Sequence, residues 1–186
     1  MSYLREYTDP KTFADFTDFE QIQAQLKKNG ILLEKWDAGA SLAESAGAEE
    51  VLAAYESSIE KLKNSRGFKT QDVVAINPDT PNHSEMRKKF LQEHTHRDDE
   101  ARYFVEGSGL FYIHNNNQTV QLLLCEKGEL INLPAGTRHW FDMGSQPYFK
   151  AIRVFLDPEG WIGNFTGSGV DQDYPGFDEF MQSLKR

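Results

Sequence analysis

The sequence predicts a mainly β fold with flanking helices, and three observations support this fold class. Between residues 94 and 156, short β-type runs alternate with turn residues, a spacing typical of an antiparallel sandwich or barrel. Helical periodicity occurs only outside that region. The 13 phenylalanines among 186 residues suit the interior of a sheet better than that of a helical bundle.

Three helices are expected before the β-rich region. Residues 17–30 open with Thr17 and Glu20 at capping-box spacing, followed by an apolar stripe. Residues 47–67 form the clearest helix, because apolar residues recur at helical spacing and lysines gather near the end. Residues 84–92 make a third, shorter helix. A last amphipathic turn or two is expected in the tail PGFDEFMQSLKR.

Turn residues separate the runs that are expected to be strands. NNNQ (115–118) and EKGE (126–129) read as hairpin turns. The expected strands are, in chain order, ILLEKW (31–36), DVVAI (72–76), ARYFVEG (101–107), GLFYIH (109–114), TVQLLLCE (119–126), ELINLPAG (129–136), RHWFDM (138–143) and YFKAIRVFL (148–156).

Composition excludes several classes of protein. The net charge of -9 and the isoelectric point of about 5.0 argue against sequence-independent nucleic-acid binding, which needs a basic face. The single cysteine, Cys125, excludes an internal disulfide and is expected to be a small core residue. His83 and His114 are expected at the surface. Because no signal-peptide core and no membrane-length apolar run is present, we expect a cytoplasmic protein without membrane association.

The stretch EHTHRDDE gathers three residues that can bind a metal. His94 and His96 are two residues apart, so they face the same way in extended backbone, and Glu100 can return to that face. A hairpin-rich sheet could bring His139 beside them. Three imidazoles and one carboxylate suit Fe(II), Ni(II), Mn(II), Co(II) or Zn(II). Four protein ligands on a six-coordinate metal leave two open positions, which favours chemistry over a structural role.

The spacing of these ligands is similar to the two motifs of the cupin superfamily. In the first segment six residues separate Glu100 from a glycine, Gly107, and the second segment runs from Gly128 through a proline and a glycine to His139. The chain departs from the pattern at Lys88, where a glycine is common, and at Met143, where an asparagine is common. The resemblance implies a cupin barrel, also called a double-stranded β-helix or jelly roll.

Longer segments resemble the bacterial acireductone dioxygenase family. They are EHTHRDDEARYFVEGSGLFYIH, LCEKGELINLPAGTRHWFDMG and AIRVFLDPEGWIGNFTG, together with FEQIQAQLKKNGILLEKW and VLAAYESSIEKLK nearer the start. The resemblance implies a dioxygenase of methionine salvage that acts on 1,2-dihydroxy-3-keto-5-methylthiopentene and O2. It implies one Fe(II) or Ni(II) per chain. The iron form would give 2-keto-4-methylthiobutyrate and formate, and the nickel form methylthiopropionate, formate and carbon monoxide.

The resemblance also implies roles for individual residues. The metal ligands would be His94, His96, Glu100 and His139. Strand alternation from Glu100 places Arg102 on the same face, where a fixed cation would stabilise a substrate dianion. Expected substrate-binding residues are Phe90, Phe104, Phe141, Arg153 and Trp161. Glu93 and Asp99, which flank the ligands, are expected in auxiliary roles.

We expect one domain over residues 1–186, with N-terminal helical elements at about 1–92, a metal-binding barrel at about 70–165 and a C-terminal tail at about 166–186. A monomer with a small-molecule substrate and no nucleic-acid partner is expected. Three alternatives stay open. They are another cupin dioxygenase acting on a chelating enol, a metal-binding cupin without turnover, and a zinc cupin isomerase whose activity would survive without O2.

Overall fold

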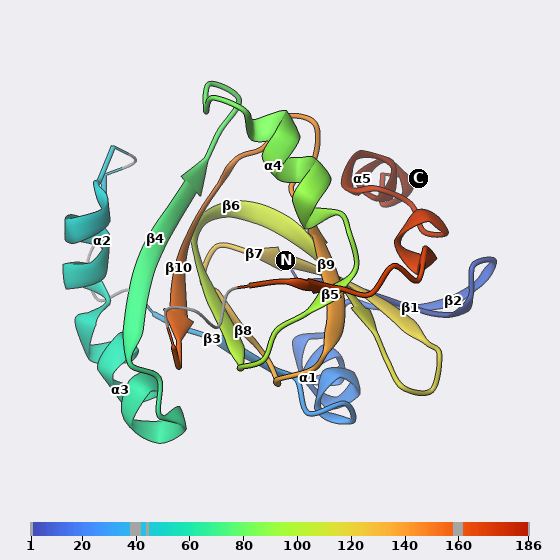
Figure 1. The fold of residues 1–186 in the computed structure, drawn as a ribbon, viewed down its shortest axis with the longest axis horizontal. Helices are drawn as coiled ribbons and strands as arrows, with labels where there is room; N and C mark the ends of the chain where they lie inside the picture. Colours follow the sequence, from blue (N-terminus) through green and yellow to red (C-terminus); the bar gives the residue numbers. More distant parts are fainter. Residues whose placement is uncertain (1, 38–41, 44, 158–161, 186) are drawn as a thin grey trace.

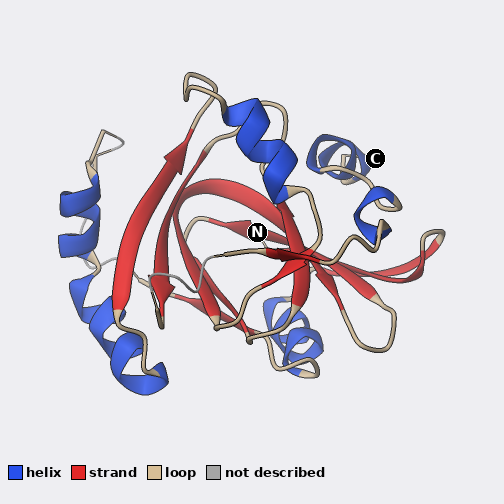
Figure 2. Cartoon of the chain, in the orientation of Figure 1, coloured by secondary structure: helices blue, strands red, loops and turns tan. Residues whose placement is uncertain are grey.

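The structure, a computed structural model, describes residues 2–37, 42–43, 45–157 and 162–185. Strands form the centre and helices surround it (Figure 1; Figure 2). The elements are β1 (Tyr3–Asp9), β2 (Thr12–Phe16), α1 (Phe19–Lys27), β3 (Leu32–Lys35), α2 (Ala48–Ala54), α3 (Glu56–Arg66), β4 (Thr70–Ile76), α4 (His83–Phe90), β5 (His94–Thr95), β6 (Glu100–His114), β7 (Val120–Glu126), β8 (Glu129–Leu133), β9 (Arg138–Asp142), β10 (Phe149–Phe155), β11 (Asn164–Phe165), the 3-10 helix Val170–Gln172 and α5 (Phe177–Ser183).

The strands form two antiparallel sheets that share β6. One sheet has the order β11-β5-β9-β6-β7-β1-β2. In the other, β8 and β10 flank the first half of β6, while β3 pairs with β8 and β4 pairs with β10. The mainly β fold with flanking helices that the sequence predicts is therefore confirmed.

A sharp bend lets β6 serve both sheets. Gly107 has φ +68°, and a Cβ there would lie 1.8 Å from the Tyr148 carbonyl oxygen, so no other residue fits. Just before the bend, the ladder to β10 skips one residue: Lys150 faces Glu106, whereas Ala151 faces Phe104. Such a bulge reverses the alternation of side chains along the strand.

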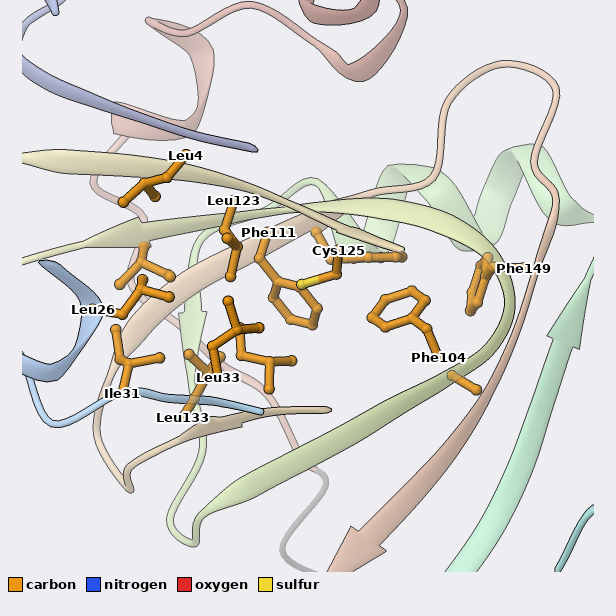
Figure 3. Packing of buried hydrophobic residues seen from close by; sticks show 14 of the residues in the cluster. Leu4, Leu26, Ile31, Leu33, Phe104, Phe111, Leu123, Cys125, Leu133 and Phe149 are labelled. Carbon is orange, nitrogen blue, oxygen red and sulfur yellow. The ribbon is translucent and has the colours of Figure 1, made fainter. Parts of the chain in front are cut away.

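Apolar side chains fill the space between the sheets. Leu4, Leu26, Leu33, Phe104 and Phe111 belong to this inner cluster, and each is at most 1% exposed (Figure 3). A second cluster lies between α2, α3 and the outer face of the sheet that contains β4 and β10. A third joins α5 to β1, β7 and β9. Cys125 is completely buried in the inner cluster, as expected.

Several local expectations need correction. The helix expected at 47–67 is two helices, because Tyr55, with φ -109°, ends α2 and precedes α3. The N-cap of α1 is Asp18, whose carboxylate accepts a hydrogen bond from the Gln21 amide, and not Thr17. The predicted turn at 126–129 connects β7 in one sheet to β8 in the other and does not close a hairpin.

The largest difference lies at the start of the chain. β3 and β4 lie where strands were expected, at 31–36 and 72–76, but the hairpin of β1 and β2 was not predicted. β1 pairs with β7 along residues 3–7, which extends the first sheet. Within the described residues, the structure contains no helix long and apolar enough to cross a membrane.

Candidate metal centre

Three histidines meet where β5 and β9 run side by side. The two strands pair so that His94 lies directly opposite His139. His96 follows His94 by two residues and faces the same way. The candidate ligand nitrogens of the three rings all lie within 4.8 Å of one another. The structure thus brings together three side chains that are separated by up to 45 positions in the sequence.

Glu100, the first residue of β6, completes the group. Its Oε2 lies 2.9 Å from Nε2 of His139 and 3.2 Å from Nε2 of His96. The side chain is 6% exposed. Burial alone raises the pKa of Glu100, but the charge of Arg102 and the contacts with His139 and His96 outweigh it and hold that pKa well below its ordinary value. Glu100 is therefore an anion at the centre of the cluster.

The backbone sets which nitrogen of two of these rings faces inward. Nδ1 of His139 lies 2.8 Å from the Thr137 carbonyl, and Nδ1 of His94 lies 2.7 Å from the Gln92 carbonyl. A carbonyl only accepts, so each Nδ1 carries the hydrogen and leaves Nε2 as the inward nitrogen. Burial and the neighbouring His139 lower the pKa of His94 to about 4, which keeps that ring neutral near pH 7.

This donor set fits a divalent cation. In a neutral His139, the Nε2 lone pair faces the Glu100 carboxylate at 2.9 Å, an arrangement that is repulsive unless positive charge lies between them. The three imidazole nitrogens lie within 4.8 Å of one another, and the carboxylate contacts two of these rings, as ligands of a metal would. The carbonyl contacts of His94 and His139 correspond to the outer interactions that orient metal-binding imidazoles.

Arg102 places a buried positive charge beside the cluster. Its Nε lies 2.7 Å from Oε1 of Glu100, an ion pair without the alignment of a hydrogen bond. The guanidinium carbon lies 5.5 Å from the ring centre of Phe111 and 5.2 Å from that of Phe141. Both rings present their electron-rich faces to the cation. These contacts hold the guanidinium in one place.

A cavity of about 170 Å³ opens onto the histidines and Arg102. Aromatic rings form much of its wall, and the rest is polar or charged. The lining residues are Lys89 and Phe90 of α4, His94, His96, Arg102 and Phe111, His139 and Phe141, Arg153 of β10, and Gly163 and Phe165 near β11. A cavity with apolar walls and a few convergent polar groups is typical of a small-molecule site.

Comparison with known proteins identifies the family. The model of the ARD/ARD' family matches residues 3–163. Acireductone dioxygenase of Parvibaculum lavamentivorans is 48% identical over 185 residues, which cover 98% of this chain and 100% of that protein. This chain belongs to the acireductone dioxygenase family. The enzyme of the same name from Aquifex aeolicus is 47% identical over 97% of this chain and 99% of its own length.

A solved acireductone dioxygenase supports the fold. The enzyme from Bacillus anthracis, with a cadmium ion in its active centre, superposes with a TM-score of 0.79. It is 30% identical, and the match covers 89% of this chain and 98% of that one. The cupin barrel expected from the motif spacing is therefore confirmed. A metal in the active centre of that relative agrees with the convergent ligands found here.

Arg153, expected in the acireductone dioxygenase substrate site, lines the cavity but is only half-buried. It lies opposite Arg102 on one side and Asp72 on the other. Asp72 accepts two hydrogen bonds from its guanidinium, at 2.8 and 2.6 Å. Asp72 was not singled out from the sequence. Because Asp72 lies opposite Arg153 on the neighbouring strand, its carboxylate pairs with this second cation of the cavity.

Phe104 is not among the described residues that line the cavity, although it was expected at the substrate site. Phe104 is completely buried in the inner cluster, where it contacts Phe111 and Phe141, and it is a core residue. Phe111 lines the cavity, because the bulge at Val105 shifts the alternation so that odd-numbered residues of β6 face inward beyond it. Trp161 lies outside the described residues.

His114 was expected at the surface, and this expectation is wrong. It is 6% exposed, and its Nδ1 lies 2.6 Å from Oε2 of Glu93. The other oxygen of Glu93 accepts hydrogen bonds from Thr166 and Ser168. Burial raises the pKa of Glu93, but these partners outweigh it and lower the pKa below its ordinary value. Glu93, the residue before His94, thus holds Thr166 and Ser168 after β11 through hydrogen bonds.

Asp99 connects the two ligand segments. Its Oδ1 accepts a hydrogen bond from the Ala135 amide at 2.9 Å, and its Oδ2 accepts one from the Asn132 side chain at 3.3 Å. The chain that leads into β9 is therefore fixed to the residue before Glu100. Lys89, Gly163 and Phe165 also lie at the cavity but were not found from sequence, because only their spatial neighbours reveal them.

Proposed function

We propose that this chain is a metal-dependent dioxygenase that cleaves an acireductone, 1,2-dihydroxy-3-keto-5-methylthiopentene, with O2 in methionine salvage. One observation carries the proposal. Three imidazoles and a carboxylate converge beside a buried guanidinium, in a cavity with aromatic walls, in a chain of the acireductone dioxygenase family. A chelating, acidic enediol is the kind of substrate that such a site suits.

His94, His96, Glu100 and His139 would hold one divalent metal ion per chain, either Fe(II) or Ni(II). Mixed nitrogen and oxygen ligands accept both metals, so the cell's supply would decide between them. When bound, the metal would act as a Lewis acid toward the substrate's enediol oxygens. With iron we expect 2-keto-4-methylthiobutyrate and formate, and with nickel methylthiopropionate, formate and carbon monoxide.

Arg102 would stabilise the second negative charge of the substrate. The enediol must lose protons before O2 can attack it, and a dianion is costly inside a barrel unless a fixed cation lies beside it. The ion pair with Glu100 and the rings of Phe111 and Phe141 hold the guanidinium ready, so no reorganisation is needed. Arg153 would add positive charge from the next strand.

The aromatic walls would bind the substrate's methylthio tail. Phe90 and Phe141 meet edge to face with ring centres 6.2 Å apart, and both line the cavity with Phe111. Burying an apolar tail against them is favourable, at about 25 cal/mol per Å². The same rings would keep water away from the reacting oxygens and so strengthen the electrostatic contribution of Arg102.

The proposal also covers the organisation of the chain. Residues 1–186 would act as one domain, since β1 joins the barrel through β7 and α5 packs in the cluster that contains β1 and β9 residues. We propose a monomer in the cytoplasm. Its one cysteine, Cys125, is a free thiol, in keeping with a reducing compartment.

The test is O2 consumption with synthetic acireductone. The protein would be stripped of metal and reloaded with Fe(II), and the non-enzymatic rate would be subtracted. His96→Ala removes a proposed ligand, whereas His83→Ala removes a histidine outside the cluster and serves as the matched control. We expect rapid, metal-dependent uptake in the wild type and in His83→Ala, with loss of both bound metal and uptake in His96→Ala.

The contrary result is equally clear. Wild-type protein that holds Fe(II) by elemental analysis, yet consumes no O2 above background, would not be an acireductone dioxygenase. A different chelating enol or a role without turnover would then become the leading explanation of the site.

A further inference from the structure

Three cations line the cavity, and their partners differ. Arg102 is paired with Glu100, and Arg153 is paired with Asp72. Lys89 is exposed, and among the described residues no carboxylate lies within ion-pair distance of its ammonium. Lys89 is therefore the cavity cation whose charge is not already matched by a described neighbour.

The position of Lys89 is fixed by the helix that carries it. Two residues earlier on α4, Arg87 binds Asp142 through two hydrogen bonds of 2.6 and 2.9 Å. Asp142 is completely buried on β9, three residues after His139. One residue after Lys89, Phe90 packs on Phe141 of the same strand. The last turn of α4 is thus fastened to a strand that carries a candidate metal ligand.

The neighbouring lysine shows that this orientation is specific. Lys88 has a side chain that is 68% exposed, and its Nζ lies 2.7 Å from Oε1 of Glu85. It does not line the cavity. Two adjacent lysines of one short helix therefore point to different surroundings, and only Lys89 borders the cavity.

The overall charge makes such a cation useful. The chain carries a net charge of -9, which repels an anionic substrate as it approaches. A local group of positive charges at the opening offsets this repulsion and raises the association rate. Arg102 is buried and Arg153 is half-buried, so Lys89 is the cation that an incoming anion meets in solvent.

We propose that Lys89 is a substrate-recognition residue that binds the anionic enolate of the substrate at the cavity opening. This rests on the proposed dioxygenase function and adds a residue that determines specificity for an anionic enol. Lys89 acts outside the metal cluster, on capture of the substrate. Its removal therefore raises KM and leaves kcat nearly unchanged, because Arg102 still holds the charge where reaction occurs.

The experiment compares Lys89→Ala with Lys88→Ala, since each removes one lysine charge from the same helix. Both proteins are loaded with Fe(II), and metal content is checked. We measure kcat and KM by O2 uptake at low and high salt, and the Kd for acireductone by ultraviolet titration without O2. In Lys89→Ala we expect KM and Kd to rise by roughly fivefold at low salt, with a smaller rise at high salt. Lys89→Arg should restore both values.

Each other outcome counts against the proposal. Equal KM and Kd in Lys89→Ala and Lys88→Ala would overturn the role of Lys89 while wild-type turnover left the dioxygenase function standing. A fall in kcat without a change in Kd would place Lys89 in the chemical step and contradict a recognition role. A wild type that binds Fe(II) but does not turn over would remove both proposals together.

Discussion

Two regions of opposite character meet at Phe111 and Phe141. On one side, the inner cluster is a continuous apolar core in which Phe104 packs against the rings of Phe111 and Phe141. On the other side, Glu100 and Arg102 are buried charges that pair with each other, and Glu100 also contacts the rings of His96 and His139. The comparison teaches that a change in the core lowers mainly the free energy of unfolding, whereas removal of one charged partner lowers both stability and function.

Glu100→Ala should have the largest effect, because it removes a proposed ligand and the partner of Arg102 at once. An unpaired buried guanidinium costs about 3–5 kcal/mol in the free energy of unfolding. Metal affinity and kcat/KM should each fall by more than ~100-fold. Chemical denaturation, elemental analysis and O2 uptake check these three values. Wild-type stability in the mutant would show that Arg102 does not rely on Glu100.

Arg102→Lys sharpens the comparison, because it keeps the charge and removes the planar guanidinium. A lysine ammonium cannot reproduce the contacts that fix the cation between Glu100 and the two rings. We expect kcat to fall by about 100-fold, with bound metal unchanged. Activity within threefold of wild type, with metal in place, would mean that charge alone suffices and that orientation is unimportant.

A pair of phenylalanine variants separates stability from substrate binding. Phe104→Ala opens a cavity in the core and should cost about 3–5 kcal/mol of unfolding free energy, with KM little changed in folded protein. Phe90→Ala alters a half-buried cavity residue, so KM should rise several-fold at a cost of about 1 kcal/mol. Denaturation curves and steady-state kinetics measure both. The reverse pattern would return Phe104 to the substrate site.

Asp72→Asn should have the smallest effect. It weakens the two hydrogen bonds that hold Arg153 at the cavity. The Asp72 side chain is 46% exposed, so solvent screens the pair and the loss of stability should stay below about 1 kcal/mol. We expect a twofold to fourfold rise in KM, on the order of a weakened surface ion pair. No change in KM would show that Arg153 holds its position without Asp72.

Much of the centre could be predicted from sequence because its signals are local. The spacing of His94, His96 and Glu100 fixes their faces once the backbone is extended, and that part of the prediction agrees with the structure. Arg102 follows Glu100 by one strand period and lies beside it. Phe104 follows by the same rule and also faces the barrel interior, but it packs in the inner cluster instead of lining the cavity. The bulge at Val105 lies beyond it and reverses the alternation only for the later residues of β6.

Other positions could not be predicted, because they depend on partners far along the chain. His114 reads as a turn residue until Glu93, 21 positions earlier, meets it in the folded barrel. Asp142 belongs to the distinctive HWFDMG segment, but its role as the anchor of α4 depends on Arg87. Polar and charged side chains are usually exposed. They can be buried only where a partner far along the chain satisfies their hydrogen bonds or balances their charge.

By itself, the sequence determined the class of fold, most of the strand and helix positions and the likeness to one family, since periodicity, turn residues and motif spacing are properties of neighbouring residues. Tertiary structure alone decided that His139 lies opposite His94, that Phe111 replaces Phe104 at the cavity and that Lys89 borders it. The reason is physical. The register between distant strands and the contacts of a helix on a barrel minimise the free energy of the whole chain, and no local segment encodes them.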